Sequence, residues 1–194
     1  GAISRCAELN RNLRLEVVSA LSSQLLHQLD NSGLDLAIFK CVGDFTPSDQ
    51  RWQCHLLRRE PLHWVAAQRH DFDRMSDIPL VIFPDGCCYR SAALAALDQP
   101  GKHGYSAYVS ASYDNIRAAV SAGLGIGVLP ASALAEDHII LGKREGFPEL
   151  PMVELLMVQA SQKRATQQLA DFLTLSTATK SQFISTPLAD ATPT

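Results

Sequence analysis

The sequence predicts an α/β fold built mainly on parallel sheets. Segments with strand patterns alternate with segments whose apolar residues recur at helical spacing, which is typical of sheets covered by helices. Residues 78–83 form a continuous apolar run, as in a strand buried on both faces. The 194 residues are 46% hydrophobic and 19% charged, so they suffice for one large or two small globular domains.

The first third of the chain predicts a helix, a strand, a second helix and a second strand. Ile3, Cys6 and Leu9 have helical spacing, and residues 13–18 alternate as a strand does. Ser19 or Ser22 is expected to cap the next helix, which ends at residues 31–33. The apolar stripe of that helix comprises Leu21, Leu25, Leu26 and Leu29. A strand is also expected over residues 34–39. The resulting order of strand, helix and strand has the length of a βαβ crossover.

The middle of the chain predicts strands on both sides of Pro61. Residues 53–58 and 62–67 are apolar-rich and form either two strands or one bent strand, because proline cannot donate to a ladder. The buried strand over residues 78–83 leads through the turn at residues 84–86 into a helix over residues 91–97.

The last part of the chain continues the alternation. A strand is expected over residues 105–111, then a helix capped by Ser112 that ends at Gly123, then a strand over residues 124–129. Further strands are expected over residues 138–141 and 152–158. The final helix carries an apolar face of Ala165, Leu169, Phe172 and Leu173. The residues after 178 are mostly Ser, Thr, Pro and Ala and predict a loose tail.

Composition excludes several classes of function. The net charge of −3 does not favour binding to nucleic acid through its phosphates, because such binding normally uses an excess of positive charge. No run is long and apolar enough for a membrane span, and no secretory signal is present. The odd count of five cysteines without a CxxC motif fits a reducing cytoplasm. The six histidines lack metal-ligand spacing and no catalytic motif is present, so we expect no metal, no cofactor and no catalytic residue.

The glycines of residues 123–127 do not predict a dinucleotide site. A phosphate-binding loop requires the order strand, glycines, helix, so that the helix N-terminus faces the pyrophosphate. Here the glycines follow a helix and precede a strand. A helix C-cap with close packing against the next strand is the better interpretation.

Cys87 and Cys88 lie in the turn between the buried strand and the next helix. A helix N-terminus lowers the pKa of a thiol, so redox sensing or nucleophilic chemistry is one interpretation. Packing or ligand lining is the other and is favoured, because adjacent cysteines form only a strained disulfide. Arg90, in the first helical turn, is expected to pair either with an anion or with Asp85.

Two turns that connect a strand to a helix predict a ligand site. They are residues 84–90 and residues 110–114, and ligands in parallel α/β sheets bind outside the carboxyl ends of strands. Helix N-termini there favour carboxylates and other anions. The hydroxyls of Ser110 and Ser112 are candidate donors to the ligand, with plain N-capping as the alternative.

The sequence resembles the effector-binding domain of LysR-type transcriptional regulators. The resemblance rests on residues 34–38, 61–66 and 83–90, and above all on Ala118-Ala119-Val120-Ser121-Ala122-Gly123-Leu124-Gly125-Ile126-Gly127-Val128-Leu129-Pro130. It covers roughly residues 5–175. It implies two Rossmann-like subdomains as in type 2 periplasmic binding proteins, with antiparallel crossing strands over residues 62–67 and 155–159. Subdomain I would take residues 1–66 and 157–178, subdomain II residues 67–156, and the tail residues 179–194.

The resemblance also implies the positions of the ligand site and the dimer interface. A small-molecule effector would bind between the subdomains, and the predicted ligand-binding residues are Pro84, Asp85, Gly86, Cys87, Arg90, Ser110, Ser112, Tyr113, Val128, Leu129, Phe39, Lys40 and Ser19. The predicted dimer interface comprises Leu15, Val17, Leu25, Leu29, Ile116 and Val120. For these apolar residues the alternative is that they face their own sheets. The winged helix-turn-helix of such regulators and the first strand of the effector domain are missing from this sequence.

We therefore expect a ligand-sensing and dimerisation domain, not an enzyme, that works in the cytoplasm. Its partners would be a small-molecule effector, most plausibly an organic acid, and further copies of itself in a homo-dimer or tetramer. It would bind DNA only through the missing N-terminal domain and would not bind to a membrane. The alternatives are a solute-binding protein of a transporter, an enzyme that uses Cys87 or Cys88, and a thiol redox-sensing regulator that uses these two cysteines.

Overall fold

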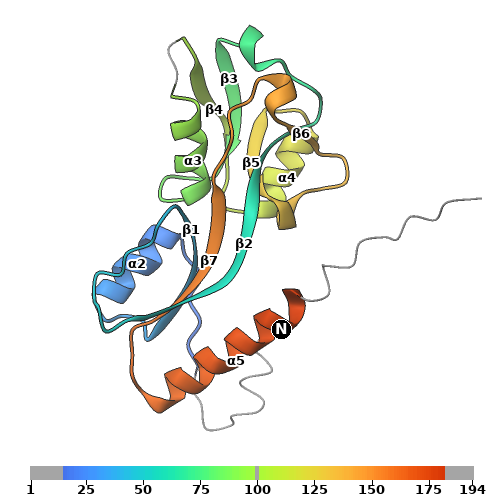
Figure 1. Ribbon diagram of the computed structural model, residues 1–194. Coiled ribbons are helices and arrows are strands. Elements are labelled where there is room, and N and C mark those ends of the chain that lie inside the picture. Colours follow the sequence, from blue (N-terminus) through green and yellow to red (C-terminus); the bar gives the residue numbers. More distant parts are fainter. Residues whose placement is uncertain (1–14, 99–100, 182–194) are drawn as a thin grey trace, which may run out of the picture.

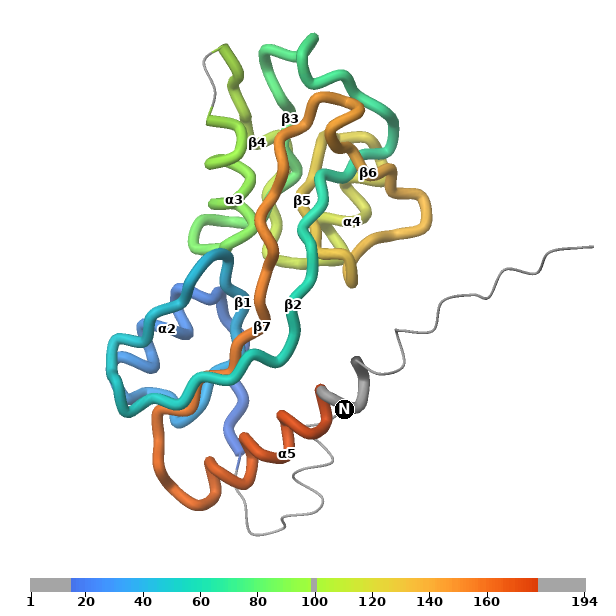
Figure 2. The backbone as a smooth tube through the Cα atoms, in the orientation of Figure 1, coloured from blue at the N-terminus to red at the C-terminus, as the bar shows by residue number. Residues whose placement is uncertain are grey.

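The chain forms two lobes joined by two long strands (Figure 1). The computed structural model describes residues 15–98 and 101–181, with side chains to residue 177. The joining strands are β2 (Gln53–Ala66) and β7 (Met152–Gln159), which run side by side through both lobes (Figure 2). The first lobe adds α2 (Ser22–Asp30), β1 (Leu36–Val42) and α5 (Arg164–Ser181). The second lobe adds β3 (Asp77–Ile82), α3 (Cys88–Ala96), β4 (His103–Val109), α4 (Tyr113–Ser121), β5 (Ile126–Pro130) and β6 (Ile139–Leu141).

Strand β2 belongs to the sheets of both lobes. Its first part pairs antiparallel with β7, from Gln53↔Gln159 to Pro61↔Met152, and β7 pairs antiparallel with β1 on its other side. The second part of β2 pairs with β5 and β6 in the second lobe. The strand order β1-β7-β2-β5-β3-β4 is therefore continuous. Of the two possibilities around Pro61, one long strand is correct; a register shift between Leu56 and Arg58 interrupts its ladder.

Parallel pairing is more restricted than the alternation of strands and helices predicts. In the described ranges, β3 pairs parallel with β4 and β5, and every other pair is antiparallel. The physical reason is that β2 and β7 pass between the lobes in opposite directions and pair with each other. The antiparallel crossing strands implied by the resemblance are confirmed as β2 and β7, but the part of β2 that pairs with β7 is Gln53–Pro61, and Leu62–Ala66 pairs with β5 and β6 instead.

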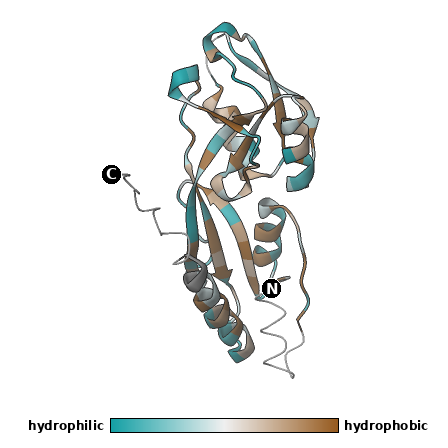
Figure 3. Cartoon of the chain, turned by 90° about the vertical axis from the view of Figure 1, so that its right-hand side faces the viewer, coloured by the Kyte–Doolittle hydropathy of each residue, from teal (hydrophilic) through white to brown (hydrophobic). Residues whose placement is uncertain are grey.

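Each lobe has its own hydrophobic core. In the second lobe α3 and α4 pack on β3 and β5, where Ile78, Leu80 and Ile126 are fully buried. In the first lobe α2 and α5 cover opposite faces of the sheet, which Figure 3 shows from the side. The period-2 alternation of β1 explains this, because Phe39 packs with α2 whereas Ile38 packs with α5.

The predicted strand over residues 13–18 is wrong in the part that the structure describes. Residues 15–18 have no strand conformation, because no neighbouring strand pairs with them there. The βαβ crossover predicted from them is therefore not formed in the described residues. The predicted helix over residues 3–9 lies outside the described residues. Helix α5 continues to Ser181, and the rest of the predicted tail lies outside the description.

Two helix starts also differ from the predictions. The residue at the N-cap of α2 is Leu21, not Ser19 or Ser22, and its N–H donates to Oε1 of Gln24 at 3.2 Å. Helix α3 begins at Cys88, three residues before the predicted start, so that both cysteines lie at its N-terminus. The cap predicted at Ser112 is confirmed, since its Oγ accepts from the N–H of Asn115.

Candidate functional site

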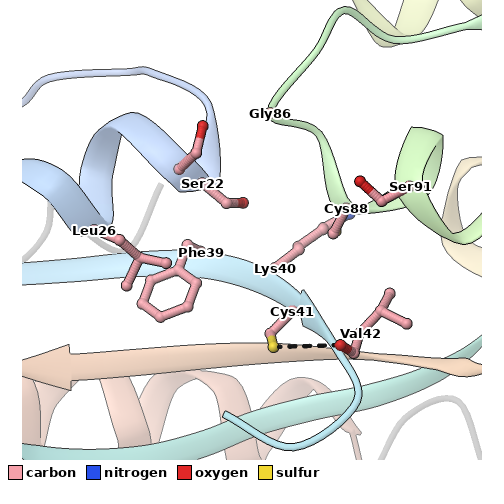
Figure 4. A pocket seen from close by; sticks show the side chains of 10 residues that line it. Ser22, Leu26, Phe39, Lys40, Cys41, Val42, Gly86, Cys88 and Ser91 are labelled. Atoms are coloured by element: carbon pink, nitrogen blue, oxygen red, sulfur yellow. Dashed lines mark hydrogen bonds between the residues drawn. The ribbon is translucent and has the colours of Figure 1, made fainter. Parts of the chain in front are cut away.

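A pocket of about 300 Å³ lies between the two lobes, where α2 and β1 face the start of α3 (Figure 4). The first lobe contributes apolar side chains, two serines and a lysine to it, and the second lobe contributes the turn before α3 and the first turn of that helix. The lining residues are Ser22, Ser23, Leu26, Phe39, Lys40, Cys41, Val42, Gly86, Cys88 and Ser91. This is the inter-lobe position at which the resemblance places the effector.

At Gly86 the turn of the second lobe lies close to the start of α2 in the first lobe. Its φ of +88° lies in the left-handed region that glycine favours. A Cβ at this position would lie 2.4 Å from Oγ of Ser23 at the start of α2. A side chain at residue 86 would therefore require either that the Ser23 hydroxyl rotate away or that the turn and α2 move apart.

Lys40 carries the only ammonium group among the described residues that line the pocket. Its side chain extends from β1 toward Cys88 in Figure 4. Its Nζ donates to Oη of Tyr113 at 2.9 Å and lies 4.9 Å from the centre of that ring. Burial lowers the pKa of Lys40, and Arg58 acts in the same direction against the opposing field of Glu60. The result is a partly desolvated cation held by neutral groups.

Two tyrosines complete the surroundings of Lys40. The Oη of Tyr113 donates to Oη of Tyr89 at 2.9 Å, and Nζ of Lys40 lies 5.2 Å from the centre of the Tyr89 ring. Burial raises the pKa of Tyr113 to about 12 and raises that of Tyr89 further. Both phenols are thus neutral at physiological pH and act as hydrogen-bonding groups, not as counter-charges.

Cys87 and Cys88 are adjacent thiols at the start of α3. The neighbouring Cys88 thiol lowers the pKa of Cys87 to about 7 against the effect of burial. The N–H groups of Tyr89 and Arg90 and the charge of Lys40 act in the same direction. The pKa of Cys88 is raised, because the adjacent Cys87 sulfur and its own burial disfavour its thiolate.

A second polar cluster joins the lobes beside the pocket. Glu60 of β2 is 9% exposed and accepts hydrogen bonds from the N–H and Oγ of Ser132, at 2.8 and 3.0 Å, and from Nη2 of Arg58 at 2.8 Å. Burial would raise the pKa of Glu60, but the two bonds from Ser132 and the charges of Arg58 and Lys40 lower it overall. Glu60 is therefore a carboxylate that ties the crossing strand to the segment after β5.

The structure brings some of the predicted ligand residues together. Phe39, Lys40 and Gly86 line the pocket, and Tyr113 contacts Lys40 directly. Cys87 adjoins the pocket through Cys88. These residues come from both lobes, as the prediction requires.

Other predicted ligand residues serve the second lobe itself. Arg90 pairs with Asp85 at 2.8 Å and donates to the carbonyl of Phe83, so the Asp85 alternative is the observed one. Ser110 accepts from the N–H of Ser112 and from Nδ2 of Asn115, and Ser112 caps α4, as plain capping predicts. Pro84 lies in the same turn but does not line the pocket.

Three further predicted ligand residues do not line the described pocket. Val128 and Leu129 are 3% and 0% exposed, because every residue of β5 is covered by its neighbours in the second lobe. Ser19 is exposed and precedes α2. Their assignment to the ligand site therefore stays a prediction that this pocket does not support.

Four of the predicted dimer residues face their own lobes. Leu25 and Leu29 pack on β1, and Ile116 and Val120 are fully buried against the core of the second lobe. These four side chains are not available to a partner, so the alternative considered for them is the observed one. The exposed apolar residue of the predicted set is Val17, at 65%.

Sequence reasoning missed part of the pocket lining. Ser23 and Leu26 were not expected at the site, and Glu60 beside it was not singled out at all. The alternation of β1 predicts that Phe39 and Lys40 leave the strand on opposite faces, so it does not predict that both line one pocket; that depends on how the lobes are packed together.

Metal sites and membrane-spanning helices were also sought among the residues that the structure describes. No group of three or more His, Cys, Asp or Glu side chains among them could hold a metal ion. None of the helices in the described ranges is long and apolar enough to cross a membrane.

Comparisons with known proteins agree with this architecture. Residues 1–179 match the family model of the LysR substrate binding domain. The HTH-type transcriptional regulator PecT of Dickeya dadantii is 28% identical over 149 residues, which are 77% of this chain and 45% of that protein. The chain thus spans about half the length of the curated relatives it matches.

Two solved structures show the same fold. One is the bromide ion-bound regulatory domain of HypT from Salmonella typhimurium, with a TM-score of 0.70, 13% identity, and coverage of 92% of this chain and 91% of that one. The other is the CcmR regulatory domain of Synechocystis PCC6803 in complex with 2-PG, with a TM-score of 0.65, 18% identity, and coverage of 91% and 89%. The family match over nearly the whole chain and the two-lobed fold lead to one assignment: this chain belongs to the LysR substrate-binding domain family.

Proposed function

We propose that this chain is the effector-sensing domain of a LysR-type transcriptional regulator and that its effector is a small organic acid bound in the inter-lobe pocket. The observation that carries the proposal is Lys40, an ammonium group at the pocket wall whose hydrogen-bond partner is a neutral phenol. No ion pair joins Lys40 to a carboxylate among the described residues, so its charge is available to an anionic ligand. A carboxylate accepts charge-assisted hydrogen bonds from such a group.

The two related structures support an anion. HypT was solved with bromide and CcmR with 2-PG. The apolar wall of Leu26, Phe39 and Val42 in this chain would contact the carbon skeleton of an organic acid. The volume of about 300 Å³ suits a small molecule.

Signalling would follow from the position of the pocket between two lobes. A ligand that binds one degree of closure better than another shifts the population toward it. That shift would be felt by a DNA-binding part elsewhere in the full-length regulator and by the packing of subunits in a homo-dimer or tetramer. The domain would work in the cytoplasm and would catalyse no reaction. The family match favours this regulator over the solute-binding protein of a transporter.

Isothermal titration of the purified chain with benzoate, malate and 3-phosphoglycerate tests the proposal. At least one of these anions should bind, and Lys40→Met should weaken it about 10- to 100-fold, as expected for losing a charged hydrogen bond of about 1.5–3 kcal/mol. Lys143→Met is the matched control, because Lys143 is exposed and pairs with Glu149 away from the pocket. An anion that binds equally well to the Lys40 variant would overturn the assignment of the site.

A further inference from the structure

The hydrogen bond between Lys40 and Tyr113 crosses from one lobe to the other. Lys40 belongs to β1 in the first lobe, and Tyr113 is the first residue of α4 in the second lobe (Figure 1). The distance of 2.9 Å between Nζ and Oη is that of a charge-assisted hydrogen bond. Tyr113 donates in turn to Tyr89 of α3, also at 2.9 Å. A chain of hydrogen bonds therefore runs from the first lobe into the core of the second.

The tyrosine end of this chain is held by packing within the second lobe. Tyr89 is 2% exposed, and its ring centre lies 5.7 Å from that of Phe83. The ring centre of Tyr113 lies 4.9 Å from that of Phe83. Ser112 caps the helix that Tyr113 begins, so the backbone is held there as well. The Tyr113 hydroxyl is thus a preorganised acceptor for a cation from the other lobe.

The lysine end is a flexible side chain that takes its position from the second lobe. Holding a lysine in one rotamer costs conformational entropy, so its contacts must offset that cost. The contacts of Nζ are with the Tyr113 hydroxyl and with the faces of the Tyr113 and Tyr89 rings, whose centres lie 4.9 and 5.2 Å away. Each of these groups belongs to α3 or α4. The place of the ammonium at the pocket wall therefore depends on the lobe opposite to its own.

We infer that Tyr113 is a positioning residue for the Lys40 ammonium and that the hydrogen bond between them is a latch that holds the two lobes together at the pocket. The inference rests on the proposed function only in taking the occupant of the pocket to be an anion. One N–H of Lys40 donates to Tyr113, and its other N–H groups have no partner among the described residues, so a bound anion would accept from them. The anion would then be connected through Lys40 to α4, and a filled pocket would favour the closed arrangement of the lobes.

A double-mutant cycle on the ligand-free chain tests the latch. Lys40→Met removes the donor and keeps an apolar stem, whereas Tyr113→Phe removes the hydroxyl and keeps the ring that packs on Phe83. Their combined effect on the unfolding equilibrium constant in urea should be about 3- to 10-fold smaller than the product of their separate effects. The control combines Lys40→Met with Tyr105→Phe, because Tyr105 lies exposed on β4, and these two effects should simply multiply.

The acetylation rate of Lys40 tests the positioning, which stability alone does not report. The chain is mixed with limiting acetic anhydride at about pH 8, quenched and digested for peptide mass spectrometry. Tyr113→Phe should raise the rate of Lys40 about 3- to 10-fold, because the lost bond both held the side chain and favoured its charged, unreactive form. Lys143, which pairs with Glu149 away from the pocket, should react at an unchanged rate. Tyr89→Phe leaves the acceptor of Lys40 in place and should raise its rate less.

The inference is wrong if the effects of Lys40→Met and Tyr113→Phe multiply as the control pair does, or if Tyr113→Phe leaves the acetylation of Lys40 unchanged. An equal rise in the rate of Lys143 would also contradict it, since that would indicate general loosening of the fold. Circular dichroism shows whether each variant is folded. Should Tyr113→Phe not fold, an unchanged rate of Lys40 in Tyr89→Phe overturns the inference instead. These measurements contain no anionic ligand, so their failure is distinguishable from failure of the proposed function, which the anion titrations decide.

Discussion

Gly86 lies where the second lobe comes close to the start of α2 in the first lobe. Two costs act at this residue: a positive φ that disfavours any L side chain, and a contact with Ser23 that leaves no room for a Cβ. Gly43 has a similar φ of +79°, but nothing lies within 4 Å of the position of its Cβ. The two glycines therefore allow the two costs to be measured separately.

Gly86→Ala should destabilise the domain more than Gly43→Ala does. The Gly43 variant should lose about 1 kcal/mol of unfolding free energy through its backbone conformation alone. The Gly86 variant should lose about 1–3 kcal/mol more, because the lobes must move apart or Ser23 must shift. Urea denaturation of both variants and the unmodified chain measures this. Equal losses would mean that the close approach at Gly86 imposes no constraint.

At the scale of elements, the C-terminal cap of α2 places a serine in the left-handed conformation that glycine favours. The N–H of Ser32 donates to the carbonyl of Leu29 and the N–H of Gly33 donates to that of Gln28, which is the Schellman arrangement. The residue in the left-handed conformation is Ser32, with a φ of +58°, although glycine follows it directly. The sequence predicts the end of the helix correctly but not which residue takes the strained conformation.

Ser32→Gly should stabilise the domain by about 0.5–1 kcal/mol, because glycine adopts a positive φ without steric cost. Ser22→Gly, within the first turn of α2, should have the opposite sign, because glycine weakens helical residues. Thermal unfolding followed by circular dichroism at 222 nm compares the two. A lower melting temperature for Ser32→Gly would contradict the account of this cap.

At the scale of the whole molecule, the lobes are tied by strands and by one buried carboxylate. Glu60 and Arg58 belong to β2, whereas Ser132 follows β5 in the second lobe. The bonds among them therefore connect the crossing strand with the wall of the second lobe. The pKa of Glu60 is lowered in the folded state, which means that the folded protein binds the carboxyl proton less tightly than the unfolded chain does.

The stability supplied by Glu60 should depend on pH with a definite sign. It should be fully present above the unfolded pKa of a glutamate, about 4.3, and should be lost as the pH falls through the lower folded pKa. Glu60→Gln should cost about 1–3 kcal/mol at pH 7 and should flatten the decline of stability below pH ~4.3. Urea titrations at pH 3–7 test this, with the exposed Glu136→Gln as the control. An unchanged acid limb in the Glu60 variant would contradict the linkage.

Much of the architecture could be read from local patterns. The alternation of strands and helices, the buried strand over residues 78–83 and the cap at Ser112 follow from periodicity and turn chemistry, which depend on near neighbours. The resemblance supplied the two-lobed fold and the antiparallel crossing strands. The boundaries of the subdomains at residues 66 and 156 remain a prediction, since β2 and β7 run through both lobes.

The candidate site was predictable only in part. Phe39, Lys40 and Gly86 were expected and lie at the pocket, whereas Val128, Leu129 and Ser19 were expected and do not line it. A strand pattern shows that two faces exist but not which face a second lobe will cover. For the same reason, Leu25 and Ile116 could equally be assigned to a dimer interface or to their own cores.

The sequence by itself determined the α/β class, the order of most elements and a turn rich in nucleophilic and cationic residues, because those properties reside in short stretches of chain. Tertiary structure alone decided that Lys40 contacts Tyr113, 73 residues away in the sequence, that Glu60 is hydrogen-bonded to Ser132, and that Cys88 lines a pocket. Such meetings depend on how two separately packed lobes are set against each other by β2 and β7, and no local pattern encodes that placement.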